Sequence, residues 1–231
     1  SFNGTQFYWA RLCNNTFVEL YNTTVITANT WYHIVAVAND TNFSLFVNNN
    51  VITDTQAQLS TPHNDNTNNF GLGTAFKWGG SVDYDAFGGY LDDFRIYDKA
   101  LSETEIKQIY GDRSKFDNGY VYNYANTSPY FDGVLKNVLK NTNSLDGYPG
   151  YKDHENDLIA WYKFDDDFTD SSGNGNDLTN VSATISTNTK ILGSGAFNAV
   201  HTGRVGKYAT GTNDFVHTNN ELSINLWINV D

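Results

Sequence analysis

The stretch that decides the fold is GGYLDDFRIYDKALSETEIKQIYG at residues 88–111. Its first half predicts a strand over 90–97, and its second half predicts a short helix over 102–110. Ser102 and Glu105 have the spacing of a capping box, in which the two side chains satisfy backbone N–H groups at the start of a helix. The last residue of the stretch is a glycine and is expected to end that helix. The stretch therefore has the form of the closing strand and terminal helix of a β-sandwich.

A second stretch, LIAWYKFDDDFTDSSGNGND at residues 158–177, has the form of an opening strand followed by its first turn. The opening of a sandwich thus comes after its closing along this chain. Short runs rich in aromatic and β-branched residues, bounded by Asn, Gly, Asp and Ser, indicate an all-β protein. Strands are expected at 31–38, 43–47, 90–97, 158–164 and 222–229, and helices only near 102–110 and 134–140.

Both stretches resemble parts of the laminin-G-like jelly rolls of the concanavalin A-like lectin/glucanase superfamily. The most specific motif is the closing signature, which comprises Gly89 to Tyr97, then Ala100-Leu101-Ser102 and Glu105-Ile106. The other motifs are the strand Trp31-Tyr32-His33-Ile34-Val35, the hairpin Leu45-Phe46-Val47-Asn48-Asn49, the pair Gly71 and Gly73, and the turn Asp170-Ser171-Ser172-Gly173-Asn174-Gly175-Asn176. Asn49 stands where the family usually has glycine, a mild departure because asparagine also adopts left-handed conformations. The resemblance implies an antiparallel β-sandwich with one short C-terminal helix per domain.

The resemblance also implies a division of the chain. Residues 1–111 correspond to the C-terminal part of a sandwich, and residues 155–231 correspond to the N-terminal part of the next sandwich, or of the same one in a circular permutant. Residues 112–154 are interpreted as an ordered, tyrosine-rich connector, with a disordered linker as the alternative. Joining Asp231 to Ser1 gives an apolar strand, a polar turn and an aromatic strand, as within one sandwich. A tandem array is favoured over the permutant, because the chain starts without methionine and has the form of an excerpt from a repeating protein.

Composition narrows the function further. The formal net charge of -12 argues against nucleic-acid and anionic-membrane partners, because proteins bind such partners through clustered Lys and Arg side chains. No apolar run reaches the roughly 18 residues of a membrane helix, so no membrane insertion is expected. Cys13 is the only cysteine, which excludes an intrachain disulfide, and it is expected to be a buried apolar side chain. We expect an extracellular, cell-surface or virion-surface protein.

Glycosylation sequons fit such a location. They begin at Asn3, Asn14, Asn22, Asn39, Asn42, Asn126 and Asn180. A chain rich in Asn and Thr produces some of these by chance, so each is only a candidate, but together they permit a glycoprotein.

The strand expected at 222–229 contains a candidate carbohydrate site. A two-residue period places Leu222, Ile224, Leu226 and Ile228 on a core face and places Ser223, Asn225, Trp227 and Asn229 on the other face. An indole ring beside amides suits a sugar, because pyranose C–H groups stack on aromatic rings while amides bond to hydroxyls. Trp227, Asn225 and Asn229 are therefore the carbohydrate-binding candidates. The alternative is that a loop or the partner sheet covers Trp227.

Asp92 is the most diagnostic carboxylate of the chain. Strict alternation places it with Tyr90, Phe94 and Ile96 on an apolar face, where a carboxylate has to be hydrogen-bonded, paired or metal-bound. The expected role of Asp92 is to accept backbone N–H groups from a neighbouring loop, and the alternative is that it lies near a calcium ion.

The acidic turn DDDFTDSSGNGND at 165–177 is the best calcium candidate. Asp170, Asn174 and Asn176 could offer the oxygen ligands that calcium prefers, with Asp92 as a further ligand. The spacing does not match an EF-hand, and Asn and Gly also form tight turns without an ion. Calcium is thus the one candidate cofactor, and a metal-free turn is the alternative.

No catalytic constellation is visible, and we expect no enzyme. The related glucanases use carboxylates clustered along one strand, close to E-x-D-x-E, which is not found here. The histidines are scattered without metal-ligand spacing: His33, His63, His154, His201 and His217. Two function classes remain. The first is a structural or interaction module in a tandem-repeat fibre, cell-surface or virion assembly, with neighbouring copies as partners. The second is a lectin-like module that binds glycans, with calcium as a candidate cofactor.

Overall fold

The computed structural model describes residues 6–13, 16–22, 25–39, 42–54, 70–73, 75–76, 82–83, 87–116, 157–199, 207–211 and 221–231. Strands make up most of the regular structure of these residues, with one helix, α1 (Glu103–Phe116). Every pair of neighbouring strands is antiparallel. The expected all-β class is therefore confirmed.

The main sheet has eight strands in the order β12-β13-β9-β15-β3-β4-β5, with β10 also paired to β9. Its members are β3 (Trp31–Ala38), β4 (Phe43–Val47), β5 (Asn50–Asp54), β9 (Gly89–Tyr97), β10 (Leu158–Tyr162), β12 (Thr184–Ser186), β13 (Ala196–Asn198) and β15 (Leu222–Val230). The last strand, β15, lies in the middle of this sheet, where it pairs with β9 on one side and with β3 on the other. Both edges of β15 are therefore hydrogen-bonded.

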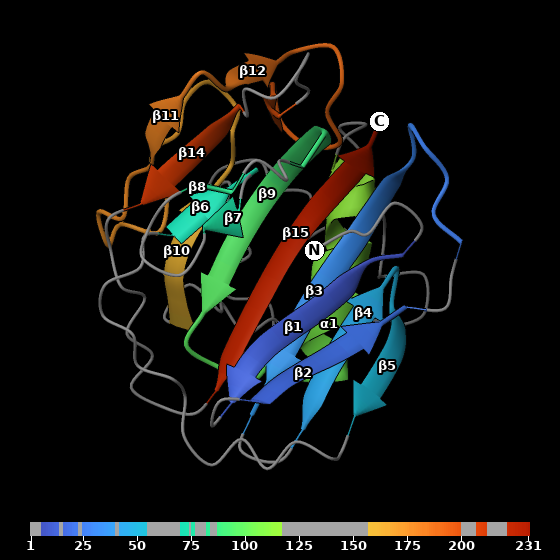
Figure 1. The fold of residues 1–231 in the computed structure, drawn as a ribbon. Coiled ribbons are helices and arrows are strands. Elements are labelled where there is room, and N and C mark those ends of the chain that lie inside the picture. The colour runs from blue at the N-terminus through green and yellow to red at the C-terminus, as the bar shows by residue number, and fades with distance from the viewer. Residues whose placement is uncertain are drawn as a thin grey trace.

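The other strands form one three-stranded sheet and two two-stranded sheets. One small sheet has the order β11-β14-β6 and consists of β6 (Phe70–Leu72), β11 (Thr179–Val181) and β14 (Tyr208–Gly211). Two hairpins complete the set: β1 (Tyr8–Cys13) with β2 (Thr16–Tyr21), and β7 (Ala75–Phe76) with β8 (Val82–Asp83). Figure 1 shows β1 and β2 crossing in front of the main sheet and α1 behind it. We call the side toward β1 and β2 the inner face and the side toward α1 the outer face.

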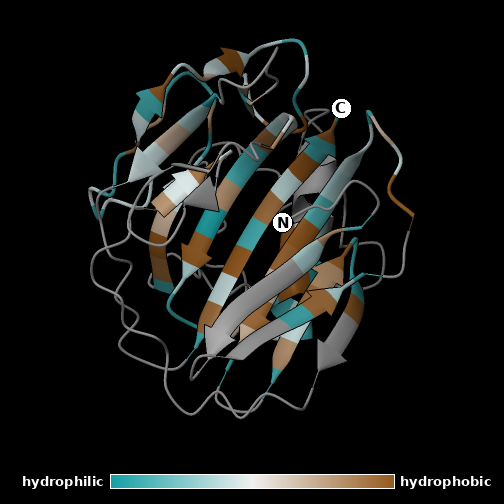
Figure 2. Ribbon diagram, in the orientation of Figure 1, coloured by the Kyte–Doolittle hydropathy of each residue, from teal (hydrophilic) through white to brown (hydrophobic). Residues whose placement is uncertain are grey.

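Apolar side chains pack on both faces of the main sheet. The inner core includes Phe94, Ile96 and Ile228, which pack with Tyr162 and Phe197. The outer core is smaller and consists of Val35, Val37, Phe46, Tyr97, Leu101, Ile106, Ile109 and Leu158. Figure 2 shows polar and apolar residues alternating along β15, as the two-residue period predicted. The aliphatic side of β15 is buried in, or packs against, the inner core, which confirms that prediction.

Two distant segments of the chain interleave in the main sheet, and we call residues 1–111 the early segment and residues 155–231 the late segment. Strands β3, β4, β5 and β9 come from the early segment, and β10, β12, β13 and β15 come from the late segment. In this structure the two segments of one chain therefore complete one sheet. The same strand pairs would form between neighbouring copies of a tandem array. Ser1 and residues 117–154, which include most of the connector expected at 112–154, lie outside the described residues.

The predicted strands are confirmed, and their bounds are close. β3 and β4 have the predicted bounds, β9 begins one residue earlier, β15 ends one residue later, and β10 ends at Tyr162. The predicted end of the helix is wrong, because α1 continues through Gly111 to Phe116. A glycine inside a helix costs only about 1 kcal/mol relative to alanine, which the surrounding helix-compatible residues outweigh. The helix expected at 134–140 lies outside the described residues.

A β-bulge in β9 corrects the predicted face of Asp92. Asp92 pairs with Trp227 and Arg95 pairs with Asn225, so two residues of β9 lie opposite one residue of β15. Asp93, inside the bulge, has a left-handed φ of 52°. Paired residues of neighbouring strands have their side chains on the same face. Asp92 therefore lies on the outer face with Trp227, and not on the apolar inner face to which strict alternation assigned it.

The backbone conformation explains the residue types at two of the family motifs. Asn48 and Asn49 have φ values of 48° and 67°, so the asparagine in place of the family's glycine adopts the left-handed conformation that the hairpin requires. Gly89 begins β9 with φ of 149°, and a Cβ at this position would overlap the carbonyl oxygen of Asn229. Only glycine allows β9 and β15 to approach each other there.

Candidate functional site

The outer face of β15 carries the three residues predicted to bind carbohydrate. Trp227, Asn225 and Asn229 alternate with the core residues, so the strand period places all three on this face. Their exposed fractions are 5, 0 and 4%, respectively. The structure thus brings the three side chains together and buries them.

Helix α1 covers this face. The ring of Tyr110 stacks on Trp227 with a centroid distance of 5.7 Å and an interplanar angle of 18°. His33 of β3 lies 5.0 Å from the Trp227 ring and 5.3 Å from the Tyr110 ring. A pyranose ring cannot stack on Trp227 while α1 is in place. The prediction of an exposed carbohydrate surface at Trp227, Asn225 and Asn229 is therefore wrong, because the helix occupies the place of the ligand.

His33 is buried between β3 and α1. Its Nε2 lies 2.6 Å from Oδ1 of Asn225 in the neighbouring strand. Burial, the largest effect, lowers the pKa of His33, the bond to Asn225 raises it in part, the nearby Arg95 lowers it, and the resulting pKa is about 4. His33 is thus a neutral, packed residue near neutral pH.

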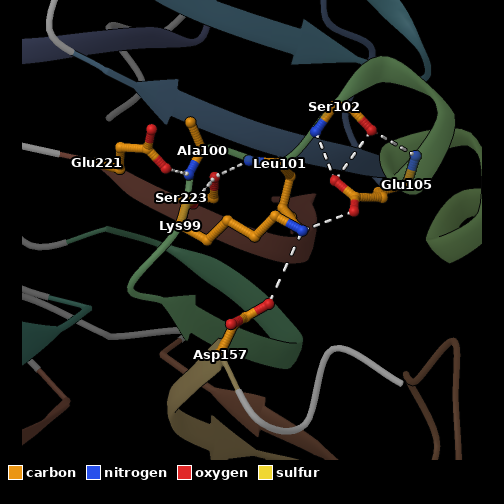
Figure 3. Close-up of polar contacts among 8 residues, drawn as sticks. All are labelled: Lys99, Ala100, Leu101, Ser102, Glu105, Asp157, Glu221 and Ser223. Atoms are coloured by element: carbon orange, nitrogen blue, oxygen red, sulfur yellow. Dashed lines mark hydrogen bonds and ion pairs between the residues drawn. The ribbon is translucent and has the colours of Figure 1, made fainter. Parts of the chain in front are cut away.

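The start of α1 is anchored to β15 by residues far away in the sequence (Figure 3). The Ser223 hydroxyl donates to the carbonyl of Lys99 at 2.6 Å and accepts the N–H of Leu101 at 2.9 Å. The N–H of Ala100 donates to Oε2 of Glu221 at 3.1 Å. The late segment therefore fixes the backbone that leads from β9 into the helix. No local sequence signal pointed to this anchor.

Charged groups around Lys99 complete the anchor (Figure 3). Lys99 Nζ lies 2.7 Å from Oε1 of Glu105 and 3.8 Å from Oδ2 of Asp157. Burial by itself would lower the pKa of Lys99, but the hydrogen bond to Glu105 and the surrounding carboxylates raise it overall. The N–H of Ser102 donates to Glu105 at 2.7 Å, and the N–H of Glu105 donates back to the Ser102 hydroxyl at 3.3 Å. The predicted capping box is thus confirmed.

Replacing Ser223 with alanine tests the anchor. Ser223→Ala leaves the carbonyl of Lys99 and the N–H of Leu101 without their buried partner, so we expect a loss of about 1–3 kcal/mol in the free energy of unfolding. Urea denaturation followed by tryptophan fluorescence measures this loss. Thr184→Ala, on an exposed strand position, is the control and should change stability by less than about 0.5 kcal/mol. Equal stability of both variants would contradict the anchoring role.

Asp92 accepts hydrogen bonds from a neighbouring loop. Its exposed fraction is 1%, and its Oδ2 accepts the N–H groups of Ile191 at 3.0 Å and of Leu192 at 2.9 Å. This is the role expected from the sequence, although the bulge places the side chain on the other face. Asp92 holds the loop that leads from β12 to β13 against the centre of the sheet.

The bulge also builds a cluster of cations and an aromatic ring. Nε of Arg95 lies 3.2 Å from Oδ1 of Asp93. Trp161 of β10 donates from Nε1 to the same oxygen at 2.7 Å. The guanidinium carbon of Arg95 lies 4.0 Å from the centre of the Trp161 ring, and Lys163 Nζ lies 4.3 Å from it. This cluster joins β9 to β10, and the sequence analysis missed the part of Trp161.

The polar groups of the turn at 165–177 form hydrogen bonds within the turn and with β10. Oδ1 of Asp170 accepts the N–H groups of Trp161 and Ser172, both at 2.9 Å. Its Oδ2 accepts the Ser172 hydroxyl at 2.8 Å and the N–H of Asn176 at 3.0 Å. Asn174 and Asn176 donate their amide N–H groups to backbone carbonyls of β10. Burial alone would raise the pKa of Asp170, but these hydrogen bonds lower it overall. Each polar group of the turn named here thus already has a hydrogen-bond partner within the turn or on β10.

Chelation should therefore leave stability unchanged. Both oxygens of Asp170 already accept hydrogen bonds, so an ion would have to break bonds that hold the turn. We expect the same Tm in EDTA as in buffer, measured by differential scanning fluorimetry. Magnesium chloride and calcium chloride at equal ionic strength are the controls. A Tm that falls in EDTA and recovers with calcium alone would show that the turn binds calcium.

The remaining site candidates fall into three groups. Among the described residues, no group of three or more His, Cys, Asp or Glu side chains could hold a metal ion. His63, His154, His201, His217, Asn3, Asn14 and Asn126 lie outside the described residues, as does the side chain of Cys13. Asn22 is buried and accepts the N–H of Phe7, so a glycan cannot attach there, whereas Asn39, Asn42 and Asn180 are at least partly exposed.

Comparisons with known proteins agree with this fold. Residues 2–107 match the family model described as concanavalin A-like lectin/glucanases superfamily, a laminin-G-like family. No curated protein and no solved structure matches the chain. Within the described residues, α1 is too short and too polar to cross a membrane.

Proposed function

Because residues 2–107 belong to the concanavalin A-like lectin/glucanase superfamily, we propose that this chain is a non-catalytic module that assembles with further copies of itself. Laminin-G-like domains are generally non-catalytic binding modules and are typically extracellular. The assembly we propose is a repetitive fibre, cell-surface or virion array in which each sandwich is one unit. The late segment of one copy completes the early segment of the next.

The central position of β15 is the observation that supports this proposal. Without β15, the facing edges of β3 and β9 lose their partner, and exposed strand edges readily pair with other chains. The early segment therefore offers a slot of fixed register, and the late segment offers the strand that fills it. A strand from a neighbouring copy fits this slot as well as one from the same chain.

The anchor of α1 supports the same conclusion. Ser223, Glu221 and Asp157 all belong to the late segment, and all three contact the backbone or side chains around Lys99 in the early segment. The segments thus meet through a sheet, a buried hydroxyl and an ion pair. Such a mixture of an apolar centre and polar surroundings is common at interfaces between protein partners.

Complementation between two full-length variants tests the assembly. Asn225→Pro disrupts β15 but leaves the early segment intact, and Val35→Pro disrupts β3 but leaves the late segment intact, because proline removes a ladder hydrogen bond. When both variants are refolded together, a copy with an intact early segment can accept β15 from the other. We expect a mixed dimer with one native sandwich, seen as a new species by light scattering and as restored near-ultraviolet circular dichroism.

A third variant provides the control. Ile228→Pro also disrupts β15, so mixing it with Asn225→Pro offers no intact β15 and should restore nothing. The wild-type chain should form larger species as its concentration rises. If the mixture of Asn225→Pro and Val35→Pro gives no more native signal than the separate variants, exchange between copies does not occur and the proposal is wrong.

The carbohydrate-binding alternative depended on an exposed Trp227. Because α1 covers this ring, the burial of Trp227 does not support carbohydrate binding at that position. The assembly is therefore the function that the geometry supports best.

A further inference from the structure

The edge of β10 that faces away from β9 is covered by the turn at 165–177. Among the described strands, β10 pairs with β9 alone. On its other side, the N–H of Trp161 donates to Oδ1 of Asp170 at 2.9 Å, and the carbonyl of Trp161 accepts the N–H of Ser171 at 2.7 Å. Open strand edges pair readily with other chains, so a turn that bonds to these backbone groups protects the sheet. We call this turn, residues 165–177, the edge cap.

Asn174 joins the edge cap to the start of β10. Its Nδ2 donates to the carbonyl of Leu158 at 2.7 Å and to the carbonyl of Ile159 at 3.1 Å. Both partners are acceptors, so this contact requires a donor at position 174. An aspartate there would be ionised near neutral pH and could only accept. Its carboxylate would therefore face two carbonyl oxygens and repel them.

The residue after Asn174 makes its side chain reactive. Asn174 precedes Gly175, and the two form the only Asn-Gly pair within the described residues. In such a pair the backbone nitrogen of the glycine can attack Cγ of the asparagine, because no side chain hinders its approach. Asn174 is exposed, and a Cβ at Gly173 or Gly175 would meet no atom within 4 Å beyond its chain neighbours. The backbone on both sides of Asn174 therefore has room to form a ring.

We propose that Asn174 is a site of spontaneous deamidation and that its conversion releases the edge cap from β10. The nitrogen of Gly175 loses its proton and bonds to Cγ of Asn174, while the Cγ–Nδ2 bond breaks and the amide nitrogen leaves as ammonia. Water then opens the cyclic imide at either of its carbonyls, which gives aspartate or isoaspartate at position 174. The sum is asparagine and water giving aspartate and ammonia, so no oxidant or reductant takes part.

Both products remove the same contact. Aspartate replaces the donating Nδ2 with an oxygen, so the bonds to Leu158 and Ile159 are lost. Isoaspartate also routes the main chain through the former side chain and so adds a methylene group to the turn. The rest of the edge cap, including the bond from Trp161 to Asp170, then loses a support. The change needs no enzyme, and it is independent of the assembly proposed above.

Ageing of the folded chain tests the site. Wild-type protein is kept in mildly alkaline buffer, and peptide mapping by mass spectrometry follows conversion at each asparagine. Asn188 is the internal comparison, because it is also exposed but precedes a threonine. We expect Asn174 to convert several-fold faster than Asn188, with isoaspartate among the products. A rate at Asn174 no higher than that at Asn188 in the folded chain would overturn the proposal.

Gly175→Asn is the matched variant for the chemistry. Gly175 has a φ of 77°, a left-handed conformation that asparagine tolerates, whereas the added side chain hinders the attacking nitrogen. We expect conversion at Asn174 to slow several-fold in this variant, while the Tm before ageing stays close to that of the wild type. An unchanged rate would contradict the route through a cyclic imide.

Asn174→Asp tests the consequence of the modification. This variant has the charge of the deamidated chain, and Asn188→Asp places the same charge at an exposed residue as the control. We expect Asn174→Asp to lower the Tm and to speed amide hydrogen exchange at Trp161, with little change in Asn188→Asp. The deamidated fraction of aged wild-type protein, separated by anion exchange, should show both effects without any substitution. If that fraction keeps the Tm and the Trp161 exchange rate of fresh protein, deamidation does not release the edge cap and the proposal is wrong.

Discussion

Lowering the pH from 7 to 5 is expected to reduce the free energy of unfolding by about 2 kcal/mol through His33 alone. Burial lowers the pKa of His33 to about 4 in the folded chain, against 6.5 when the residue is exposed. Between these two values the unfolded chain binds a proton that the folded chain does not, so stability falls as the pH falls. The loss begins near pH 6.5 and is complete below pH 4. Urea denaturation at pH 7, 6 and 5 measures it.

His33→Gln is the matched control for this pH dependence. Glutamine has hydrogen-bonding groups but does not titrate, so the variant should lose much less stability between pH 7 and 5. The comparison uses the slope against pH, because the substitution also changes the absolute stability. The nearby Arg95 stays charged throughout this range and cannot cause the change. Equal slopes in the wild type and in His33→Gln would contradict the prediction.

Replacing Asp92 with alanine is expected to cost about 3 kcal/mol. The substitution leaves the N–H groups of Ile191 and Leu192 without their buried acceptor, and each unpaired group costs about 1–3 kcal/mol. It also removes the contact that holds the β12–β13 loop against the sheet. Urea denaturation at pH 7 measures the total effect. Amide hydrogen exchange should show faster exchange at Ile191 and Leu192.

Two further substitutions isolate the cause. Asp92→Asn keeps one carbonyl oxygen as an acceptor, so it should be less destabilising than alanine. Asp166→Ala removes an exposed carboxylate in another loop and should change stability by less than about 0.5 kcal/mol. If Asp92→Ala is no more destabilising than Asp166→Ala, the loop does not depend on Asp92.

The sequence predicted the strands well because alternation and turn residues are local signals. The bounds of β3 and β4 follow from apolar runs that end at Asn and Asp, and the capping box marks the start of α1. The buried state of Asp92 and its bonds to backbone N–H groups also followed, because a carboxylate in a core strand requires such partners. These predictions depend on neighbours along the chain.

The features that the sequence did not predict depend on residues that are close in space but distant along the chain. The bulge at Asp93 appears only when β9 is set against β15, and it moves Asp92 to the face opposite the one that strict alternation gives. Both α1 and the polar side of β15 were predicted, but nothing in the sequence placed the helix over Trp227. The carbohydrate candidates failed for this reason. The pairing of Ser223 with the backbone at Lys99 and Leu101 spans the sequence in the same way.

The central position of β15 also decides when the protein can fold. His33 and Asn225 face each other across 192 residues of sequence, so the middle of the sheet depends on contacts of very high sequence separation. Such contacts form slowly, because the chain between the two strands loses conformational entropy on closing before strand pairing compensates for that loss. Until β15 of the same chain or of a neighbouring copy is in place, the facing edges of β3 and β9 therefore stay open. Aggregation between chains through these open edges is the hazard of this delay.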